Sequence, residues 1–565
     1  MEGNEGPDVH GQPSDRADVP LDRARAAYRA YQWDDAYHQF RAAAADEPLE
    51  ATDVASLADA AWWLGRTDES LELSEQVYRH HLHGSHVPQA ARLAVEVGFL
   101  WLLRGEVTLG SGWIGRATRL LEGEPESAAD GYMAFLQVQE HLGAGRHEEA
   151  IETSRWMRGL ADRHDDPTLC AVGLVLEGVA EIRRGRVEVG LRVIDEAMLP
   201  VHAGEVSPNW AGNLYCHVMD LCFEMMDLRR ARAWTDATER WCDQHSNAAM
   251  FVGICRVHRA QLLHVEGDWE AAERHAARTC EELADMNVGV VAEGHYRIAE
   301  SHRVRAEHER AEVAYRRSHE LGRDPQPGLA LLRLAQGNRA AASASLRSAL
   351  SAIDNDLHRV PLLAAQVDVA AACDDPIVAT ESAAELAAIA DTFQSVGLVA
   401  SAQYAEGVAR LALDEPTIAV APLRHAWRCW NELNAPYDAA RTRARLAEAL
   451  EASGDAETAE LELTTSRKVF AQLGAAEELR ALDHRFGSSG HIGDTGDSPG
   501  GLSAREIEVL RCVCAGRTNR QIATELMISE KTVARHLSNI FVKLDVASRT
   551  EAAAFAFTHG LADDP

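Results

Sequence analysis

The chain has 565 residues, 46% of them hydrophobic and 6% aromatic, which is typical of a globular protein and too long for one ordinary core. It contains no run of about 18 apolar residues, and its polar, acidic start lacks the features of a signal peptide, so we expect a cytoplasmic protein that does not bind membranes. The formal net charge of −32 excludes a protein that coats nucleic acid along its whole length.

The ten cysteines are scattered and form no C-x-x-C pair. The two nearest neighbours, Cys512 and Cys514, would point in different directions on a helix, which does not suit a zinc site. We therefore expect reduced, packed thiols and no metal centre.

A repeat begins after residues 1–20, a polar segment that we expect to be disordered. Glycines recur about every 40 residues, at Gly65, Gly105, Gly145, Gly185, Gly267, Gly337 and Gly454. A small residue follows each of them by five positions, at Ser70, Gly110, Ala150, Gly190, Ala272, Ala342 and Ala459. Where the glycine is missing, the small residue persists, at Ala36, Ala231, Ala311 and Ala419, while the phase near Ala379 is the least certain.

The repeat predicts helical hairpins. The glycine ends a first helix in a left-handed conformation, and acidic residues begin a second helix, as in GRHEEA from Gly145 to Ala150. The small residue lets the two helices approach closely. One hairpin cannot bury its apolar face alone, so neighbouring hairpins must stack into a solenoid.

Residues 21–486 resemble the tetratricopeptide family. The first copy fits the A-x3-F-x2-A-x4-P pattern of the second helix at Ala36, Phe40, Ala43 and Pro48. The period exceeds the usual 34 residues of that family, and a generic helical-hairpin solenoid remains the alternative. The expected fold class is all-α: a tetratricopeptide-like helical-hairpin solenoid followed by a four-helix helix-turn-helix domain.

Solenoids usually bind a partner along a concave surface, so we expect a protein or small-molecule effector on the array. Twelve tryptophans lie mostly in this region, among them Trp62, Trp63, Trp101 and Trp156. Packing explains large aromatic residues at helical spacing better than a ligand role for any one of them.

Residues 487–501, GSSGHIGDTGDSPGG, cannot form an apolar face and predict a flexible linker. A small domain follows at residues 502–561. Its first helix begins with a capping box of Ser503 and Glu506 and stops at Gly516.

Two helices close together form the centre of this domain. The first begins at Thr518, with Gln521 three positions on, and presents Ile522 inward. After a cap at Ser529, the second buries residues at i, i+4, i+7 and i+11, namely Val533, Leu537, Ile540 and Leu544. A last helix runs from near Ser548 to before Gly560.

Such a pair has helix-turn-helix geometry, whose second helix can enter the major groove of DNA. Arg535 could reach a guanine edge. The predicted base contacts are Lys531, Arg535 and Ser538. The predicted phosphate contacts are Thr518, Asn519, Arg520, Thr532 and Lys543.

The tail resembles the LuxR-type DNA-binding domain through LSAREIEVL, AGRTNRQIA, ISEKTVARHLSNIFVKL and ASRTEAA. This resemblance implies a transcription regulator that binds double-stranded promoter DNA as a dimer. The family often has a lysine where this chain has Ala534, so base contacts of that lysine do not carry over. In the family the last helix often helps two domains pair; here Ala552, Phe555 and Ala556 could do this or close the core.

The sequence offers no enzyme signature. It lacks the G-x-x-x-x-G-K-[ST] phosphate loop and H-E-x-x-H, and the G-x-S-x-G match at Ser498 falls in the linker before a proline. The run HHLH at residues 80–83 is better explained as a solvated helix end than as a metal site. We therefore expect no enzyme and no cofactor.

Charge is divided unevenly along the chain. Residues 503–560 contain eight Lys/Arg and six Asp/Glu, a net charge of +2, which leaves −34 for the remainder. Either the acidic body repels DNA and holds the tail back until a signal frees it, or its acidity only maintains solubility. We expect a sequence-specific regulator controlled by its repeat body; the alternative is a repeat-based protein scaffold whose tail is an interaction module.

Overall fold

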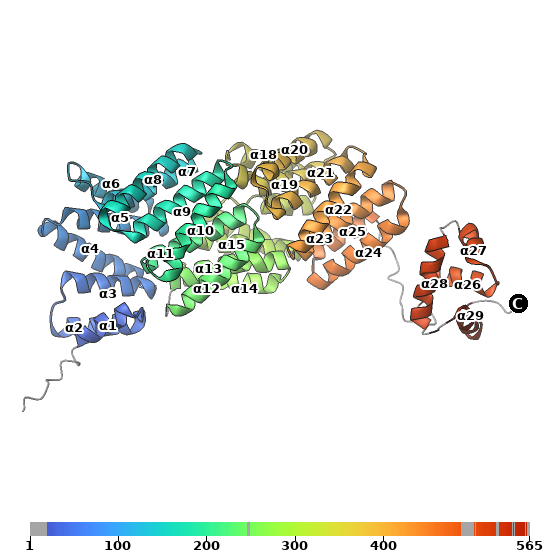
Figure 1. The fold of residues 1–565 in the computed structure, drawn as a ribbon, viewed down its shortest axis with the longest axis horizontal. Helices are drawn as coiled ribbons and strands as arrows, with labels where there is room; N and C mark the ends of the chain where they lie inside the picture. Colours follow the sequence, from blue (N-terminus) through green and yellow to red (C-terminus); the bar gives the residue numbers. More distant parts are fainter. Residues whose placement is uncertain are drawn as a thin grey trace, which may run out of the picture. The chain divides into compact units, whose positions relative to one another are not determined.

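The computed structural model describes residues 20–245, 249–486, 502, 504–526, 530–544, 546, 548–559 and 561. Within them the secondary structure is helical, and no strand is present. The chain divides into two compact units, residues 1–480 and 481–565 (Figure 1).

The described residues between 20 and 486 form twelve successive helical hairpins and one last helix, α25 (Figure 1). The helices are α1 (Pro20–Arg29), α2 (Trp33–Asp46), α3 (Ala51–Trp63), α4 (Thr67–His83), α5 (Val87–Leu103), α6 (Val107–Leu121), α7 (Ala128–Gly143), α8 (His147–His164), α9 (Pro167–Arg183), α10 (Val187–Ala203), α11 (Pro208–Glu224), α12 (Leu228–Gln244), α13 (Ala249–Glu266), α14 (Trp269–Glu282), α15 (Val288–Val304), α16 (His308–Glu320), α17 (Gly328–Ala335), α18 (Arg339–Ser351), α19 (Asp356–Ala372), α20 (Pro376–Phe393), α21 (Val396–Ala412), α22 (Pro416–Glu432), α23 (Pro436–Ala452), α24 (Ala456–Leu473) and α25 (Ala476–Phe486). The predicted helical-hairpin solenoid is confirmed.

The predicted left-handed turns lie where the repeat placed them. All seven repeat glycines have φ between +69° and +89°, and each separates the two helices of one hairpin. Where the repeat lacks glycine, other residues adopt the same conformation, with φ between +52° and +60°, at Tyr31, Met226, Ala306, Asp374 and Asp414. Asp374 settles the uncertain phase, because Ala379 follows it by five positions and is fully buried.

The small residue of each repeat lies where the two helices of a hairpin cross. At Gly190, a Cβ atom would overlap the carbonyl oxygen of Gly178 on the preceding helix and would lie 2.5 Å from a side-chain atom of Ile182. The same position is fully buried at Ala36, Ala150, Ala231 and other copies. The prediction of a close helix approach is therefore confirmed.

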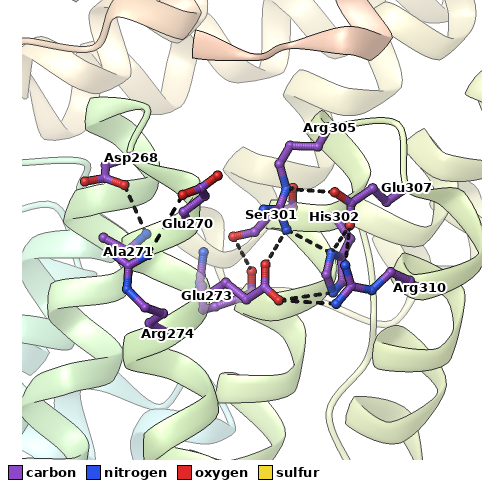
Figure 2. Close-up of polar contacts among 11 residues, drawn as sticks. Asp268, Glu270, Ala271, Glu273, Arg274, Ser301, His302, Arg305, Glu307 and Arg310 are labelled. Atoms are coloured by element: carbon purple, nitrogen blue, oxygen red, sulfur yellow. Dashed lines mark hydrogen bonds and ion pairs between the residues drawn. The ribbon is translucent and has the colours of Figure 1, made fainter.

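Polar contacts also join successive hairpins. Figure 2 shows Glu273 of α14 facing Arg305 at the end of α15 and Arg310 of α16. His302 lies between two carboxylates, with Nδ1 2.8 Å from Glu307 and Nε2 3.6 Å from Glu273. One glutamate thus links three helices of two neighbouring hairpins.

Residues far apart in sequence also touch, because the array winds back on itself. Asn209 Nδ2 donates to Asp59 Oδ1 at 2.8 Å across 150 residues, and Arg229 Nη2 donates to Glu432 Oε1 at 2.7 Å across 203 residues. His308 Nε2 lies 2.7 Å from Glu477 Oε2, 169 residues later. Successive turns of the solenoid are therefore in direct contact.

Most of the tryptophans singled out from the sequence belong to the packing. Trp33 and Trp63 stack with their ring centroids 4.8 Å apart, and Trp62 meets Phe251 from a later turn at 5.6 Å. Trp156 differs, because its side chain is 40% exposed. For Trp156 the packing interpretation is wrong: it lies on a solvent-facing surface of α8.

All ten cysteines are free thiols, five of them buried. Among the described helices, none combines the length and the apolar character that crossing a bilayer requires.

Candidate nucleic-acid interface and interior cavity

The tail forms a small domain with its own core. Its helices are α26 (Ala504–Cys514), α27 (Asn519–Glu525), α28 (Glu530–Leu544) and α29 (Arg549–Thr558). The residues predicted to point inward on α28 are buried, with Val533 and Ile540 fully so. Leu510 of α26, Ile522 of α27 and Ala552 of α29 complete the core.

Local capping explains where two of these helices begin. Thr518 and Gln521 form the predicted capping box: the Thr518 hydroxyl accepts from the Gln521 amide, and Gln521 Oε1 accepts from the Thr518 amide at 2.8 Å. The Ser548 hydroxyl accepts from the Glu551 amide at the start of α29. The caps predicted at Ser503 and Ser529 lie outside the described residues.

The predicted base-contact residues share one register on α28. Lys531, Arg535 and Ser538 stand two positions before Val533, Leu537 and Ile540, so helical periodicity places them away from the buried face. Their side chains lie outside the part that the structure describes.

The predicted phosphate contacts are held in different ways. Thr518 and Arg520 are exposed, and Thr532 is half-buried. Asn519 Oδ1 accepts from Arg549 Nη1 at 2.8 Å, which leaves the Asn519 amide group able to donate. Lys543 Nζ donates to the buried carboxylate of Glu506 at 2.6 Å.

Arg549, which sequence reasoning missed, and Glu506, which it assigned only to a helix cap, organise this surface. Arg549 reaches from α29 to Asn519 and to the carbonyl oxygen of Arg517, which ties the last helix to the start of α27. Glu506 anchors Lys543. Neither partner could be read from the helical pattern, because both contacts join helices more than 29 residues apart.

The last helix closes the core of its own domain. Ala552 and Ala556 are fully buried within this domain. Of the three residues considered for pairing, Phe555 alone is half-buried, and its ring stacks on His559 at 3.9 Å. Ala552 and Ala556, which the sequence assigned either to domain pairing or to the core, therefore belong to the core.

The repeat array has a site of a different kind, a partly open cavity of about 1610 Å³ lined by helices of the solenoid. Mainly first helices of the hairpins line it, from α3 and α5 through α11, α13 and α15 to α19 and α23. Its lining mixes aromatic and aliphatic side chains with charged ones. Trp62 and His81, noted in the sequence, are part of this lining.

His80, His81 and His83 occupy the last turn of α4, with His80 and His83 exposed, as predicted for a helix end. No group of metal ligands occurs among the described residues. Ser498 lies outside them.

Comparison with known proteins identifies the tail. The family profile described as "Bacterial regulatory proteins, luxR family" matches residues 501–556. The chain is 50% identical over 60 residues to the uncharacterized transcriptional regulatory protein YhcZ of Bacillus subtilis, covering 11% of this chain and 28% of that protein. It is 42% identical over 71 residues to the transcriptional regulatory protein LiaR of the same organism, covering 13% and 34%.

The response regulator protein VraR of Staphylococcus aureus is 45% identical over 60 residues, covering 11% of this chain and 29% of VraR. This chain therefore spans about a third or less of the length of these relatives. All three matches are to proteins named as regulators.

Solved structures resemble the chain over most of its length at low similarity. The APC/C hetero-tetramer Cut9-Hcn1 gives a TM-score of 0.34 at 12% identity and covers 83% of this chain and 96% of that one. Yeast Tom70 gives 0.32 at 12% identity, with 82% and 98% covered. The domain formed by α26 to α29 is a LuxR-family helix-turn-helix domain, joined in this chain to a helical-hairpin array.

Proposed function

We propose that the protein is a sequence-specific DNA-binding transcription regulator. In this proposal, α28 enters the major groove of promoter DNA, and the helical-hairpin array binds a signal that controls it. The observation that carries the proposal is the tail: residues 501–556 match a family of regulatory proteins, and the four residues predicted to point inward on α28 are buried.

Within the tail, Lys531, Arg535 and Ser538 are the proposed base contacts, and Thr518, Asn519, Arg520, Thr532 and Lys543 the proposed phosphate contacts. The hydrogen bonds of Asn519 and Lys543 inside the domain favour a positional role, because Arg549 and Glu506 fix these side chains before DNA arrives. Arg520, which is exposed, is the contact expected to depend most on salt.

The proposal includes a dimer on DNA. Eight cationic residues in the tail allow few phosphate contacts for each copy, and two linked copies on adjacent half-sites raise the effective concentration. A cytoplasmic, non-enzymatic role accords with this proposal.

The test is DNA selection from random duplexes with the full chain, followed by affinity measurement on the selected site. We expect Lys531→Ala with Arg535→Ala to weaken binding by at least about 2 kcal/mol, because each good base contact contributes about 1–3 kcal/mol. Arg511→Ala is the matched control, since it removes a tail arginine that donates to the Leu561 carbonyl.

Unchanged affinity in the double variant would sink the DNA proposal. If no duplex is selected while protein partners are still captured by both forms, the chain is a scaffold whose tail is an interaction module.

A further inference from the structure

The interior cavity of the array has an excess of negative charge. Eight carboxylates and four arginines line it. Several of these carboxylates are neutralised directly: Glu293 accepts from Arg297 and Arg323, and Asp368 accepts from Arg441. Asp59 accepts hydrogen bonds from two uncharged donors, Tyr28 and Asn209, each at 2.8 Å, so both of its oxygens have a partner.

Asp220 differs from these carboxylates. It belongs to a stripe along one face of α11 at helical spacing, formed by Asn209, Asn213, His217, Asp220 and Glu224, and every member lines the cavity. The Asp220 side chain keeps 65% of its surface accessible, and this surface lines the cavity. The Nε2 atom of His258 lies 3.7 Å from Asp220 Oδ1.

The groups around Asp220 do not neutralise it, because the charges of Glu224 and Glu293 oppose His217 and Arg183, which favour its ionised form. Burial lowers the pKa of His258 to about 4, so this ring is neutral near pH 7. The cations on either side are already used: Arg183 donates to Glu224 at 3.1 Å, and Arg297 donates to Glu293 at 2.6 Å.

Desolvation by the surrounding cavity walls first, and then the charge of Glu224, raise the pKa of Asp220 to about 7, although 65% of its side-chain surface remains accessible. A neighbouring cation would reverse this shift, because it favours the ionised carboxylate. Asp220 is therefore an accessible carboxyl group of the cavity whose charge the fold does not compensate.

Aromatic rings lie beside this carboxyl group. Phe223, three positions along α11, stacks on His258 with centroids 5.6 Å apart and an interplanar angle of 9°. On the other side, Phe135 lies 6.1 Å from His217 and 5.0 Å from Trp210. Aromatic faces attract cations and also provide apolar surface for a ligand body.

We propose that this cavity binds a small organic cation, a protonated amine joined to an apolar or aromatic group. The ammonium group pairs with Asp220, and the apolar part packs against Phe223 and the rings around Trp210. The cavity volume of about 1610 Å³ exceeds the roughly 300–1,000 Å³ of usual ligand sites, so the ligand fills the part near α11. This inference rests on the proposed signal-binding role of the array and specifies the chemistry of the signal.

The test compares three probes that share one apolar body: 4-phenylbutylamine, 4-phenylbutanol and 4-phenylbutyrate. Calorimetric titration of the full chain at pH 7 should show the amine binding with a stoichiometry near one and at least about tenfold more tightly than the alcohol. The carboxylate should bind most weakly, because it would face uncompensated negative charge.

Asp220→Asn should remove the preference for the amine and leave the alcohol within about threefold of its original affinity. Asp243→Asn is the matched control, since it removes one exposed carboxylate of α12 that does not line the cavity, and it should leave the preference unchanged. Circular dichroism confirms that each variant is folded.

Equal binding of amine and alcohol by the wild-type chain overturns the proposal, and so does an amine preference that survives Asp220→Asn. The proposal is also overturned if none of the three probes binds the wild-type chain. Both of these measurements on the wild-type chain are independent of whether the Asp220→Asn variant folds. DNA affinity is measured on the same samples. Loss of DNA binding with intact amine binding would refute the regulator and leave the cavity assignment in place.

Discussion

The repeat array and the tail differ in how many charged groups they bury, although a buried carboxylate is paired with a cation in both. In the tail, four helices close one core, and Glu506 is the buried carboxylate among its described residues. In the array, buried carboxylates occur repeatedly, for example Glu177, Glu300 and Asp368, and each is bound to arginine. An array that winds around a cavity keeps charged groups inside, and these groups must be paired to be tolerated.

The largest effect on stability is expected when one buried carboxylate is removed from the array. Glu300 accepts from Arg303 at 2.7 Å and from the Tyr315 hydroxyl, and these contacts outweigh burial and lower its pKa to about 2. Glu300→Ala leaves Arg303 buried without its partner. We expect it to destabilise the array by about 3–5 kcal/mol in chemical denaturation.

The control is Glu270→Ala on α14, whose ion pair with Arg274 is exposed and 4.0 Å long (Figure 2). It should cost less than about 1 kcal/mol. DNA binding by the tail should be unchanged in both folded variants. Equal destabilisation by both would show that burial does not determine how much an ion pair contributes to the stability of the array.

The second prediction concerns the helix crossings of the array. Gly190→Ala places a methyl group against the backbone of α9, which cannot move aside, and should destabilise by about 1–3 kcal/mol. Gly112→Ala makes the same change on α6, where a Cβ meets nothing within 4 Å, and should stabilise by about 0.5–1 kcal/mol. The two melting temperatures must shift in opposite directions for this account of the small-residue position to stand.

A third prediction uses the opposite charges of the two regions. If the acidic body repels DNA, residues 500–565 alone should bind the selected duplex about threefold or more tightly than the full chain at low salt. The difference should disappear at high salt, because ions screen the repulsion. Equal affinity at low salt would mean that the acidity maintains solubility only.

The smallest effect is a pH dependence at Asp220, because solvent screens a side chain that is 65% accessible. The pKa is about 7 in the folded state and near 3.8 in the unfolded chain, so the folded state binds the extra proton between these values. Stability therefore falls as pH rises between these two values and levels off above the higher one. Asp220→Asn should therefore gain stability relative to wild type as pH rises from 5 to 8. A difference in melting temperature that stays constant over this range would contradict the raised pKa.

Several features of the protein follow from sequence alone. Gly145, Gly185 and their equivalents predict the turns, and residues such as Ala150 and Gly190 predict the crossings, because both depend on signals within one period of about 40 residues. In the tail, the spacing of Val533, Leu537, Ile540 and Leu544 predicts the buried face of α28 for the same reason. The family resemblance of the tail was likewise carried by short, contiguous motifs.

Only the tertiary structure decided how the array closes and what lies inside it. The contacts of Asn209 with Asp59 and of Arg229 with Glu432 span 150 and 203 residues, a separation at which a periodic pattern specifies no partner. The pairing of Lys543 with Glu506 and the uncompensated position of Asp220 depend in the same way on which helices meet. Periodicity determines the face that a helix buries, whereas the neighbour that covers this face, and hence the charge that a side chain encounters, is fixed by how the whole chain winds.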